Sequence, residues 1–357
     1  MIPIYSRDGS EDFNRRLHAT LIEIGDEVER ALGQNLVALI LGGGYGRGEG
    51  GIVLSNGTEM PYNDLDFTLV VVRKNGIAQE ALEDVGRRFA EKLEIHVDFS
   101  RPLTIGDIEH WPHWLMWYDL INGHVVLKGP PDILEKHAPP DLLKPLAIIE
   151  GTRLLLNRGA GLLWAFRIVR GLEQSPDQDF IRRNYYKCAL ALGDALLIAH
   201  ERFTTRYLGR DVLLADLERD LPTVAAFNLQ SIYKEALRFK FRPDLVPFED
   251  ILERNLQQLA VAWGSVFLHL ENLRTGRSWS SLDDYVTWDG IREKDQHSFR
   301  MIVRNLTRNL QMGRVSWKYP RETLYRQLPI LLNLTGTGAT NWPEQTEEFL
   351  RIWNRFN

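Results

Sequence analysis

The segment that most constrains this chain is LILGGGYGRGEGGIVLSNGTEMPYNDLDFTLVVV, residues 39–72. An apolar run leads into a loop rich in glycine, and a second apolar run begins with two aspartates, Asp64 and Asp66. Successive side chains of a strand alternate between its faces, so these aspartates share one face while Leu65 and Phe67 enter the core. Carboxylates brought together in this way repel one another, and such pairs hold a hard divalent cation or share a proton.

The loop between the two apolar runs favours anion binding. Its glycines lack Cβ atoms, so their backbone N–H groups can approach phosphate oxygens closely. Arg47 adds a permanent cation within the same loop. A glycine cluster alone is typical of a tight turn, and an isolated Asp-x-Asp of a solvated strand end, but their conjunction in this order predicts a nucleotide site. The glycines are Gly42, Gly43, Gly44, Gly46 and Gly48.

GGYGRGEG followed by NDLDFTLVV resembles the signature of the nucleotidyltransferase superfamily, which includes DNA polymerase β and the minimal and aminoglycoside nucleotidyltransferases. The resemblance covers about residues 35–130. It places Gly43 and Gly44 on the family's Gly-Gly or Gly-Ser pair. Asp64 and Asp66 fall on its metal-binding carboxylates. These matches imply that the glycine loop and Arg47 bind the nucleotide.

The resemblance implies a reaction as well as a site. The family usually carries a third carboxylate on a later strand, and LEIHVDFS offers Asp98 as a further metal ligand and as the base for an acceptor hydroxyl. One or two Mg²⁺ ions would join the carboxylates to the phosphates of ATP or another nucleoside triphosphate. The implied enzyme is a transferase that moves a nucleoside monophosphate, most simply AMP, and releases pyrophosphate. Its acceptor, a small molecule, a protein or an RNA end, is left open.

Other functions remain open on the same residues. One alternative is a non-catalytic nucleotide-binding protein that acts as a regulatory or toxin–antitoxin-type component. Another is a synthetase that makes a cyclic or oligomeric nucleotide from nucleoside triphosphate alone. A P-loop is excluded because GxxxxGK[ST] is absent from the glycine loop, and a dinucleotide site would not require Asp-x-Asp on the next strand.

The chain departs from the family pattern at two places. Residues 45–63 separate Gly44 from Asp64, which is longer than the family commonly uses, so GIVLSNGTEMPY is predicted to form an inserted loop that gates or recognises substrate. Many members have serine where this chain has Gly44. Because glycine has no hydroxyl, only the backbone could contact a phosphate at that position.

Composition is that of a globular protein with room for two domains, with 357 residues, 44% hydrophobic and 25% charged. The N-terminus lacks the apolar run of a signal peptide and no stretch approaches twenty uncharged apolar residues, so we expect a cytoplasmic protein without a membrane partner. A homo-oligomer is left open. Cys188 is the only cysteine, which excludes an intramolecular disulfide and a cysteine-rich zinc site.

Charge is distributed unevenly along the chain. Residues 1–140 hold 13 Lys/Arg against 22 Asp/Glu, whereas residues 141–357 hold 30 against 26. The acidic part contains the predicted metal ligands, and the more basic part could face phosphates or an anionic substrate. A solvated helix face would explain the same asymmetry.

The order of predicted elements indicates an α+β fold, in which a small mixed-sheet nucleotidyltransferase domain, 1–138, precedes an all-helical bundle domain, 139–357. The first contains an amphipathic helix at 10–32 with Ser10 as its cap and Gly33 as its stop. Strands follow at 35–41, 64–72 and 94–99, with a helix at 77–92 between the last two, and a short helix after Pro112 precedes the strand HVVLKG. DILEKHA, between two Pro-Pro pairs, is predicted to be a connection.

The second domain is predicted to bind substrate or a partner. Helices are expected at 145–169, 179–201, 211–219, 222–240, 248–273, 291–312, 321–333 and 344–355. In a transferase of this type a cation from the helical part commonly neutralises the triphosphate. Lys187 is the residue we select, four positions from Arg183 on the same helical face, with Arg153 and Arg158 as alternatives.

Overall fold

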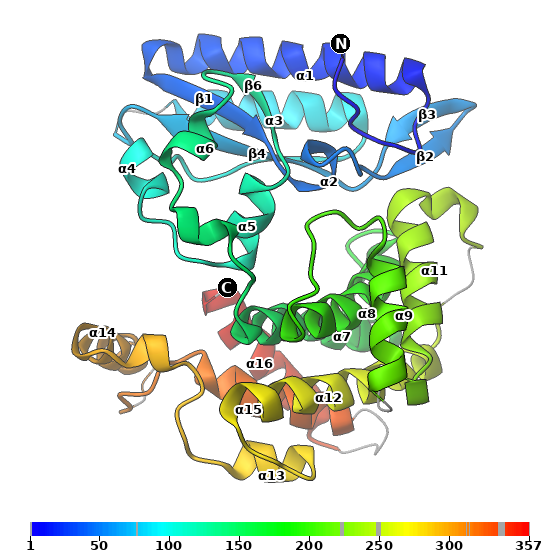
Figure 1. Cartoon of the computed structure of the whole chain (residues 1–357), viewed down its shortest axis with the longest axis vertical. Coiled ribbons are helices and arrows are strands. Elements are labelled where there is room, and N and C mark those ends of the chain that lie inside the picture. Colours follow the sequence, from blue (N-terminus) through cyan, green and yellow to red (C-terminus); the bar gives the residue numbers. More distant parts are fainter. Residues whose placement is uncertain are drawn as a thin grey trace. The chain divides into compact units, whose positions relative to one another are not determined.

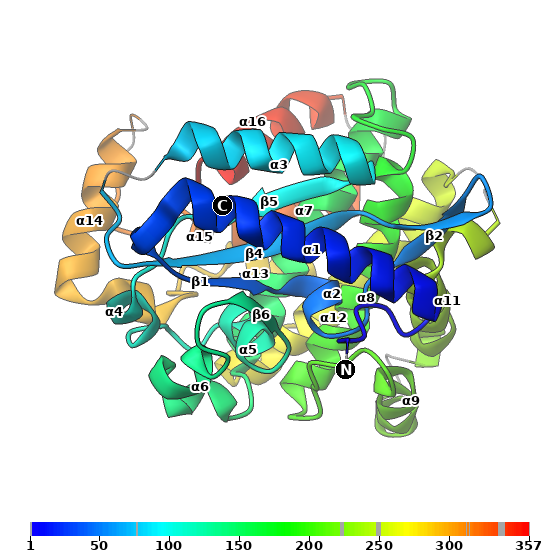
Figure 2. The same ribbon diagram turned by 90° about the horizontal axis from the view of Figure 1, so that it is seen from above.

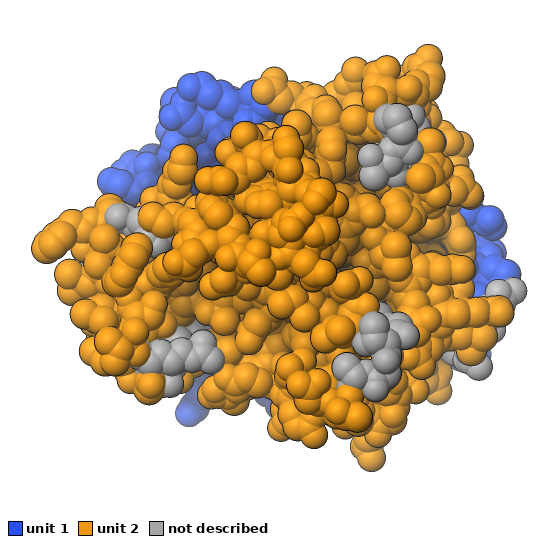
Figure 3. Space-filling model, turned by 90° about the horizontal axis from the view of Figure 1, so that it is seen from below, with its two compact units in different colours: residues 1–146, 203–211, 237–248 blue, residues 147–202, 212–236, 249–357 orange. Residues whose placement is uncertain are grey.

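The computed structural model describes residues 2–75, 78–221, 225–247, 251–311, 313, 315–334 and 340–356. The fold is mixed α/β, with a small mixed sheet and many helices (Figure 1). It divides into two compact units, coloured separately in Figure 3. Unit 1 comprises residues 1–146, 203–211 and 237–248, and unit 2 comprises 147–202, 212–236 and 249–357.

This division differs from the predicted boundary after residue 138. Leu142 and Leu146 are buried, and Leu142 belongs to the core beneath the sheet of unit 1. Burial of these side chains extends the first unit past the two Pro-Pro pairs. Two later segments, 203–211 and 237–248, also return to unit 1, and no local sequence signal predicts that return.

A four-stranded sheet in the order β5-β4-β1-β6 forms the centre of unit 1. β1 pairs antiparallel with both β4 and β6, while β4 and β5 are parallel. The apolar runs account for the central positions of β1 and β4, because both faces of these strands are covered over most of their length. The strands are β1 (Leu36–Leu41), β4 (Asp64–Val71), β5 (His96–Phe99) and β6 (Val125–Lys128).

Two helices, α1 (Glu11–Leu32) and α3 (Gln79–Leu93), cover one face of the sheet, as Figure 2 shows from above. Ser10 caps α1 by accepting a hydrogen bond from the Phe13 backbone N–H, and Gly33 ends it with φ of 54°. Both features confirm the prediction. The apolar stripe of α1 packs with alternate side chains of β1 and β4 in one core.

The opposite face is covered only toward one end of the strands. Short helices α4 (Ile105–Ile108), α5 (Leu115–Ile121) and α6 (Ile133–His137) pack there with Ala38, Ile40 and Val70. Trp111 stacks on Trp117 within this second core, with ring centroids 4.1 Å apart. The prediction that DILEKHA is only a connection was wrong, because Ile133 and Leu134 bury their side chains and form α6.

The predicted inserted loop is instead a β-hairpin. β2 (Ile52–Ser55) and β3 (Thr58–Pro61) pair antiparallel, joined by Asn56 and Gly57 with φ of 49° and 76°. Asn-Gly readily adopts positive φ at both central positions of a two-residue turn, which explains the hairpin. The Asn-Gly pair is the sequence signal for this hairpin.

All the described secondary structure of unit 2 is helical. α7 and α8 pack closely together and against α12, and Cys188 is fully buried in α8. Most of the predicted helices are found. The helix predicted at 222–240 is interrupted by a turn at 227–228, so α11 begins at Leu229, and the interval 291–312 contains the turn η4 (Lys294–His297) before α14. The predicted segments at 222–224, 248–250 and residues 77 and 312 lie outside the described residues. The helices are α7 (Ile148–Val169), α8 (Phe180–Ala199), α9 (Arg210–Asp220), α11 (Leu229–Phe241), α12 (Glu253–Thr275), α13 (Leu282–Thr287), α14 (Phe299–Leu310), α15 (Glu322–Asn333) and α16 (Trp342–Phe356). α9 begins and α11 ends in segments that belong to unit 1.

None of the helices in the described ranges has both the length and the apolar character that a bilayer-spanning segment needs.

Candidate functional site

Two aspartates, Asp64 and Asp66, lie at the N-terminal end of β4. Leu65 and Phe67 are buried in the core beneath α1 and α3. Asp64 and Asp66 therefore lie on the other face, where Asp64 is half-buried and Asp66 is exposed. The second core covers this face only from Val70 onward along β4, so the two carboxylates stand beside that core.

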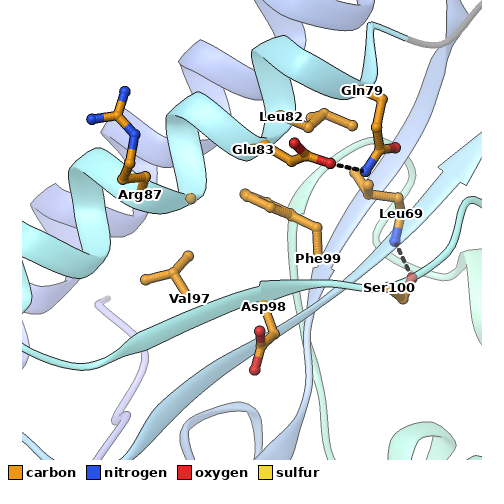
Figure 4. A pocket seen from close by; sticks show the side chains of 10 residues that line it. Leu69, Gln79, Leu82, Glu83, Arg87, Val97, Asp98, Phe99 and Ser100 are labelled. Atoms are coloured by element: carbon orange, nitrogen blue, oxygen red, sulfur yellow. Dashed lines mark hydrogen bonds between the residues drawn. The ribbon is translucent and has the colours of Figure 1, made fainter.

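The pairing of β5 with β4 adds a third carboxylate to this face. Asp66 is the register partner of Asp98, and paired residues of parallel strands point to the same side of a sheet, with Cα atoms about 4.8 Å apart. Figure 4 shows Asp98 on the side of β5 away from α3, whereas Phe99 points toward α3. The structure thus brings Asp66 and Asp98 side by side and keeps Asp64 on the same face.

A tight backbone turn lies directly against these carboxylates. The Gly42 N–H donates to the Asp66 backbone carbonyl over 2.8 Å, and the single turn α2 (Gly43–Gly46) follows. Gly43 has φ of 61°, and a Cβ atom there would lie 2.3 Å from Asp66 Oδ2. Only glycine combines this backbone conformation with this close approach. Gly44 follows in the same turn, as the sequence motif predicted.

These oxygen-rich side chains suit a hard divalent cation without forming a complete cage. Among the residues that the structure describes, no three Asp, Glu, His or Cys side chains form a ready metal-binding group. Mg²⁺ is usually bound by one or two carboxylates together with phosphate oxygens and water, and seldom by an all-protein cage. Asp64 and Asp66, with Asp98 alongside, supply that kind of donor set. The close approach of Gly43 restricts the position of the Asp66 carboxylate.

Arg47 lies next to the turn with its charge largely enclosed. Its side chain is only 9% exposed, and its Nη1 lies 3.8 Å from an oxygen of Asp119. The aliphatic stem packs on Gly123, where a Cβ atom would lie 2.2 Å from Arg47 Cγ. The buried Nε has no hydrogen-bond partner among the residues that the structure describes. The guanidinium is nevertheless a permanent cation beside the turn, which is favourable for an anion bound there.

Glu49, which sequence reasoning assigned no role, ties a distant segment to the turn. Its buried carboxylate accepts hydrogen bonds from the backbone N–H groups of Tyr207 and Leu208, at 3.0 and 3.1 Å. The Arg-Gly-Glu motif was the signal that could have singled it out. Residues 203–211 of unit 1 are thereby fixed against the glycine turn.

Two further cations reach this neighbourhood from the returning segments. Tyr207 has Arg210 Cζ 4.0 Å and Lys240 Nζ 4.5 Å from its ring centroid, and Arg47 Cζ lies 5.9 Å from it. The carbonyl of Lys240 also approaches Gly51, where a Cβ atom would lie 2.5 Å away. Sequence reasoning missed Lys240 because nothing in its local sequence indicates that it belongs to the sheet unit.

The hairpin is fastened to the same turn by Tyr45. The Tyr62 N–H donates to the Tyr45 hydroxyl over 2.8 Å, and this hydroxyl donates to the carbonyl of Gly51. Burial raises the pKa of Tyr45 well above its usual value, so the hydroxyl remains a donor. Gly50 packs beneath the Tyr45 ring, where any side chain would overlap it. These hydrogen bonds therefore fix residues 45–63 in place beside the carboxylates.

The predicted cations of the helical part belong to unit 2. Lys187 is half-buried on α8, and its role in nucleotide binding stays a prediction. Of the alternatives, Arg183 is paired with Asp177 at 2.6 Å, and Arg153 with Glu150 at 2.7 Å. These ion pairs give the two arginines structural roles within unit 2.

A pocket of about 280 Å³ lies between α3 and β5 (Figure 4). Gln79, Glu83 and Arg87 of α3 line one side of it, and Phe99 the other. Although Asp98 borders this pocket, its side chain points away from α3. The pocket is therefore separate from the carboxylate face.

No protein-family model matches this chain, and no curated protein matches it in sequence.

Proposed function

We propose that this chain is a metal-dependent nucleotidyltransferase that moves a nucleoside monophosphate, most simply AMP, from a nucleoside triphosphate to a hydroxyl acceptor and releases pyrophosphate. One observation carries the proposal. Asp64, Asp66 and Asp98 occupy one face of the sheet, and a glycine turn without room for a side chain lies against Asp66. The sequence resemblance points to the same chemistry.

Electrostatics requires a counter-cation in this reaction. A triphosphate would be repelled by three carboxylates at short range unless a divalent cation lies between them. Asp64 and Asp66 would hold Mg²⁺, with Asp98 beside Asp66 as a further ligand. When bound, the ion neutralises phosphate charge and polarises the phosphoryl group that is transferred.

The remaining roles follow from the position of each group. Asp98 accepts the proton of the acceptor hydroxyl, whose oxygen bonds to the α-phosphorus as the bond to the β-phosphate bridging oxygen breaks. The leaving pyrophosphate carries away the bonding electrons. Backbone N–H groups at Gly43 and Gly44, with Arg47, contact the phosphates, and Lys187 is the proposed cation from the helical unit.

A second candidate is a nucleotide-binding component without turnover. It rests on the same observation, because a glycine turn against carboxylates can hold a nucleotide whether or not the nucleotide is transferred. In this alternative the carboxylates and the turn bind a nucleotide with its cation, and no acceptor is used.

The two candidates are separated by incubating the protein with ATP labelled at the α-phosphate and Mg²⁺, across a panel of sugar, aminoglycoside, protein and RNA acceptors. Transfer of label with stoichiometric pyrophosphate release, lost in Asp64→Ala/Asp66→Ala, supports the transferase. A matched control is Asp12→Ala/Asp26→Ala, which removes two exposed aspartates of α1.

Calorimetric titration with ATP and Mg²⁺ completes the test. Binding that the Asp64→Ala/Asp66→Ala variant loses, without turnover on any acceptor, supports the second candidate. Neither binding nor turnover in the folded wild-type protein would reject both.

A further inference from the structure

Helix α14 of unit 2 buries polar side chains and exposes apolar ones, which is the reverse of the usual arrangement. Its buried residues are Asn305 and Asn309, at 0% and 3% exposed. Their side-chain amides donate to backbone carbonyls, Asn305 to Gln296 at 2.9 Å and Asn309 to Lys318 at 2.8 Å. The fully buried contacts of the helix are therefore hydrogen bonds to the segments that flank it, while Met301 and Ile302 are half-buried. Figures 1 and 2 show the helix at the periphery of unit 2.

The apolar side of α14 faces outward. Phe299 is 84% exposed and Leu310 is 55% exposed, with Val303 and Leu306 between them also exposed. Helices of soluble proteins normally turn such a stripe toward the core, and an exposed contiguous stripe marks an interaction site. Val315 and Trp317, just beyond the helix, are exposed as well.

The spacing of this stripe identifies the kind of surface that would cover it. Phe299, Val303, Leu306 and Leu310 are separated by four, three and four positions, and at 100° per residue they span an arc of about 60°. A narrow seam with alternating spacings of three and four is the pattern with which one helix packs on another. This arc is narrower than the stripe of about 100° or more that an amphipathic helix turns toward a broad apolar surface.

Charge selects among helical partners. No carboxylate occurs from Ser298 to Arg321, so this segment carries only positive charge. Two copies of such a helix would repel each other, whereas acidic side chains flanking a partner's seam would be attracted. The cations of this segment are Arg300, Arg304, Arg308, Arg314, Lys318 and Arg321.

We propose that α14 is a docking helix for a different protein that presents an acidic amphipathic helix. The apolar seam supplies the buried contact, and Arg300 and Arg304 select acidic flanks. This inference uses no residue of the carboxylate face and holds whether or not the chain transfers nucleotides.

The test uses a fluorescent synthetic helix with leucine at its seam positions and glutamate on both flanks, and an otherwise identical helix with lysine flanks. Fluorescence anisotropy with the full chain should show binding of the glutamate helix that weakens with salt. Phe299→Ser/Leu306→Ser should weaken this binding at least about tenfold, because it removes the aromatic anchor at one end of the seam and a leucine within it, and a few anchors carry most of the affinity of an interface. Arg300→Glu/Arg304→Glu/Arg308→Glu should reverse the preference in favour of the lysine helix.

A matched control is Val212→Ser, which removes a side chain 60% exposed on α9 and should leave binding unchanged. Equal binding of the two peptides, or binding that the seam variant does not alter, overturns the proposal.

Seam-dependent flotation with phosphatidylserine vesicles, without peptide binding, would assign the surface to a membrane. A seam-dependent dimer in sedimentation would assign it to a second copy, and a marked loss of thermal stability in the seam variant would show that the chain covers the stripe itself.

Discussion

The two units use charge in opposite ways. In unit 2 the buried Glu271 is matched by Arg274 at 2.5 Å and by the Tyr285 hydroxyl at 2.7 Å. Glu293 is similarly held by Arg153 and Tyr325. In unit 1, carboxylates of like charge stand side by side on the sheet, with Asp66 and Asp98 exposed.

This difference separates structural charge from charge available for chemistry. Burial raises the pKa of Tyr285 and of Tyr325 well above the usual value, so both hydroxyls remain donors to the glutamates they contact. Such a network holds helices together, and its members have no capacity left for a ligand. Neighbouring carboxylates gain nothing in stability from each other, and in the proposed function a divalent cation lies between them.

Replacing Asp98 with Asn should have the largest effect, if the carboxylate face is where the proposed transfer occurs. The amide cannot accept the acceptor proton, so kcat should fall by about 10²- to 10⁴-fold while ATP binding changes less. Steady-state kinetics measures this split. Asp107→Asn is the matched control, because that aspartate pairs with Lys74, which follows the other end of β4, and it should retain full activity.

Replacing Glu271 with Ala should destabilise unit 2 by about 3–5 kcal/mol, because Arg274 would be left buried without its partner. Denaturant unfolding measures the loss. Glu23→Ala provides the comparison, since its pair with Lys92 is exposed and should contribute almost nothing. Equal stability of the two variants would contradict a structural role for the buried network.

Replacing Gly43 with Ala should lower the proposed activity by about 10²-fold through displacement of the Asp66 carboxylate. The comparison is Gly171→Ala, which has a similar φ of 70° but nothing within 4 Å of the added Cβ. Both variants should lose about 1–3 kcal/mol of stability from backbone strain. Activity lost equally in the two would show that strain, and not the contact with Asp66, is responsible.

The smallest expected effect concerns Cys188. Burial raises the pKa of its thiol to about 12, from a usual value of 9.0. Above pH 9 the unfolded chain releases a proton that the folded chain keeps, so the free energy of unfolding should fall by about 1.4 kcal/mol per pH unit. Urea unfolding of Cys188→Ala between pH 9 and pH 10 should lack this slope, and an unchanged slope would contradict the assignment.

Local pattern predicts much of the sheet and little of its assembly. The strands β1, β4 and β5 lie within two residues of their predicted bounds, because apolar runs and alternation are local properties. The common face of Asp64 and Asp66 follows from that alternation. The pairing of Asp66 with Asp98 depends on register between strands far apart in sequence, which only the fold determines.

Some of the features that the sequence did not predict likewise depend on contacts between segments far apart in the chain. Tyr207 and Lys240 lie in segments that read as parts of a helical domain, and their contacts with the glycine turn depend on chain return. The hairpin at 52–61 was predictable from Asn-Gly, as α6 was from its apolar pair. Which cation of the helical unit would contact the triphosphate depends on long-range placement, so Lys187 stays a prediction.

The discontinuity of unit 1 has a consequence for biosynthesis. A nascent chain that has left the ribosome only to residue 146 has its four strands, but Glu49 still lacks the backbone donors of Tyr207 and Leu208. Unit 1 is complete only when residue 248 has been added. At ordinary elongation rates, synthesis from residue 146 to residue 248 takes about 5–20 seconds. During that time α7 and α8 emerge and can pair with each other. The ribosome therefore delivers the first helices of unit 2 before the sheet unit can close around its own glycine turn.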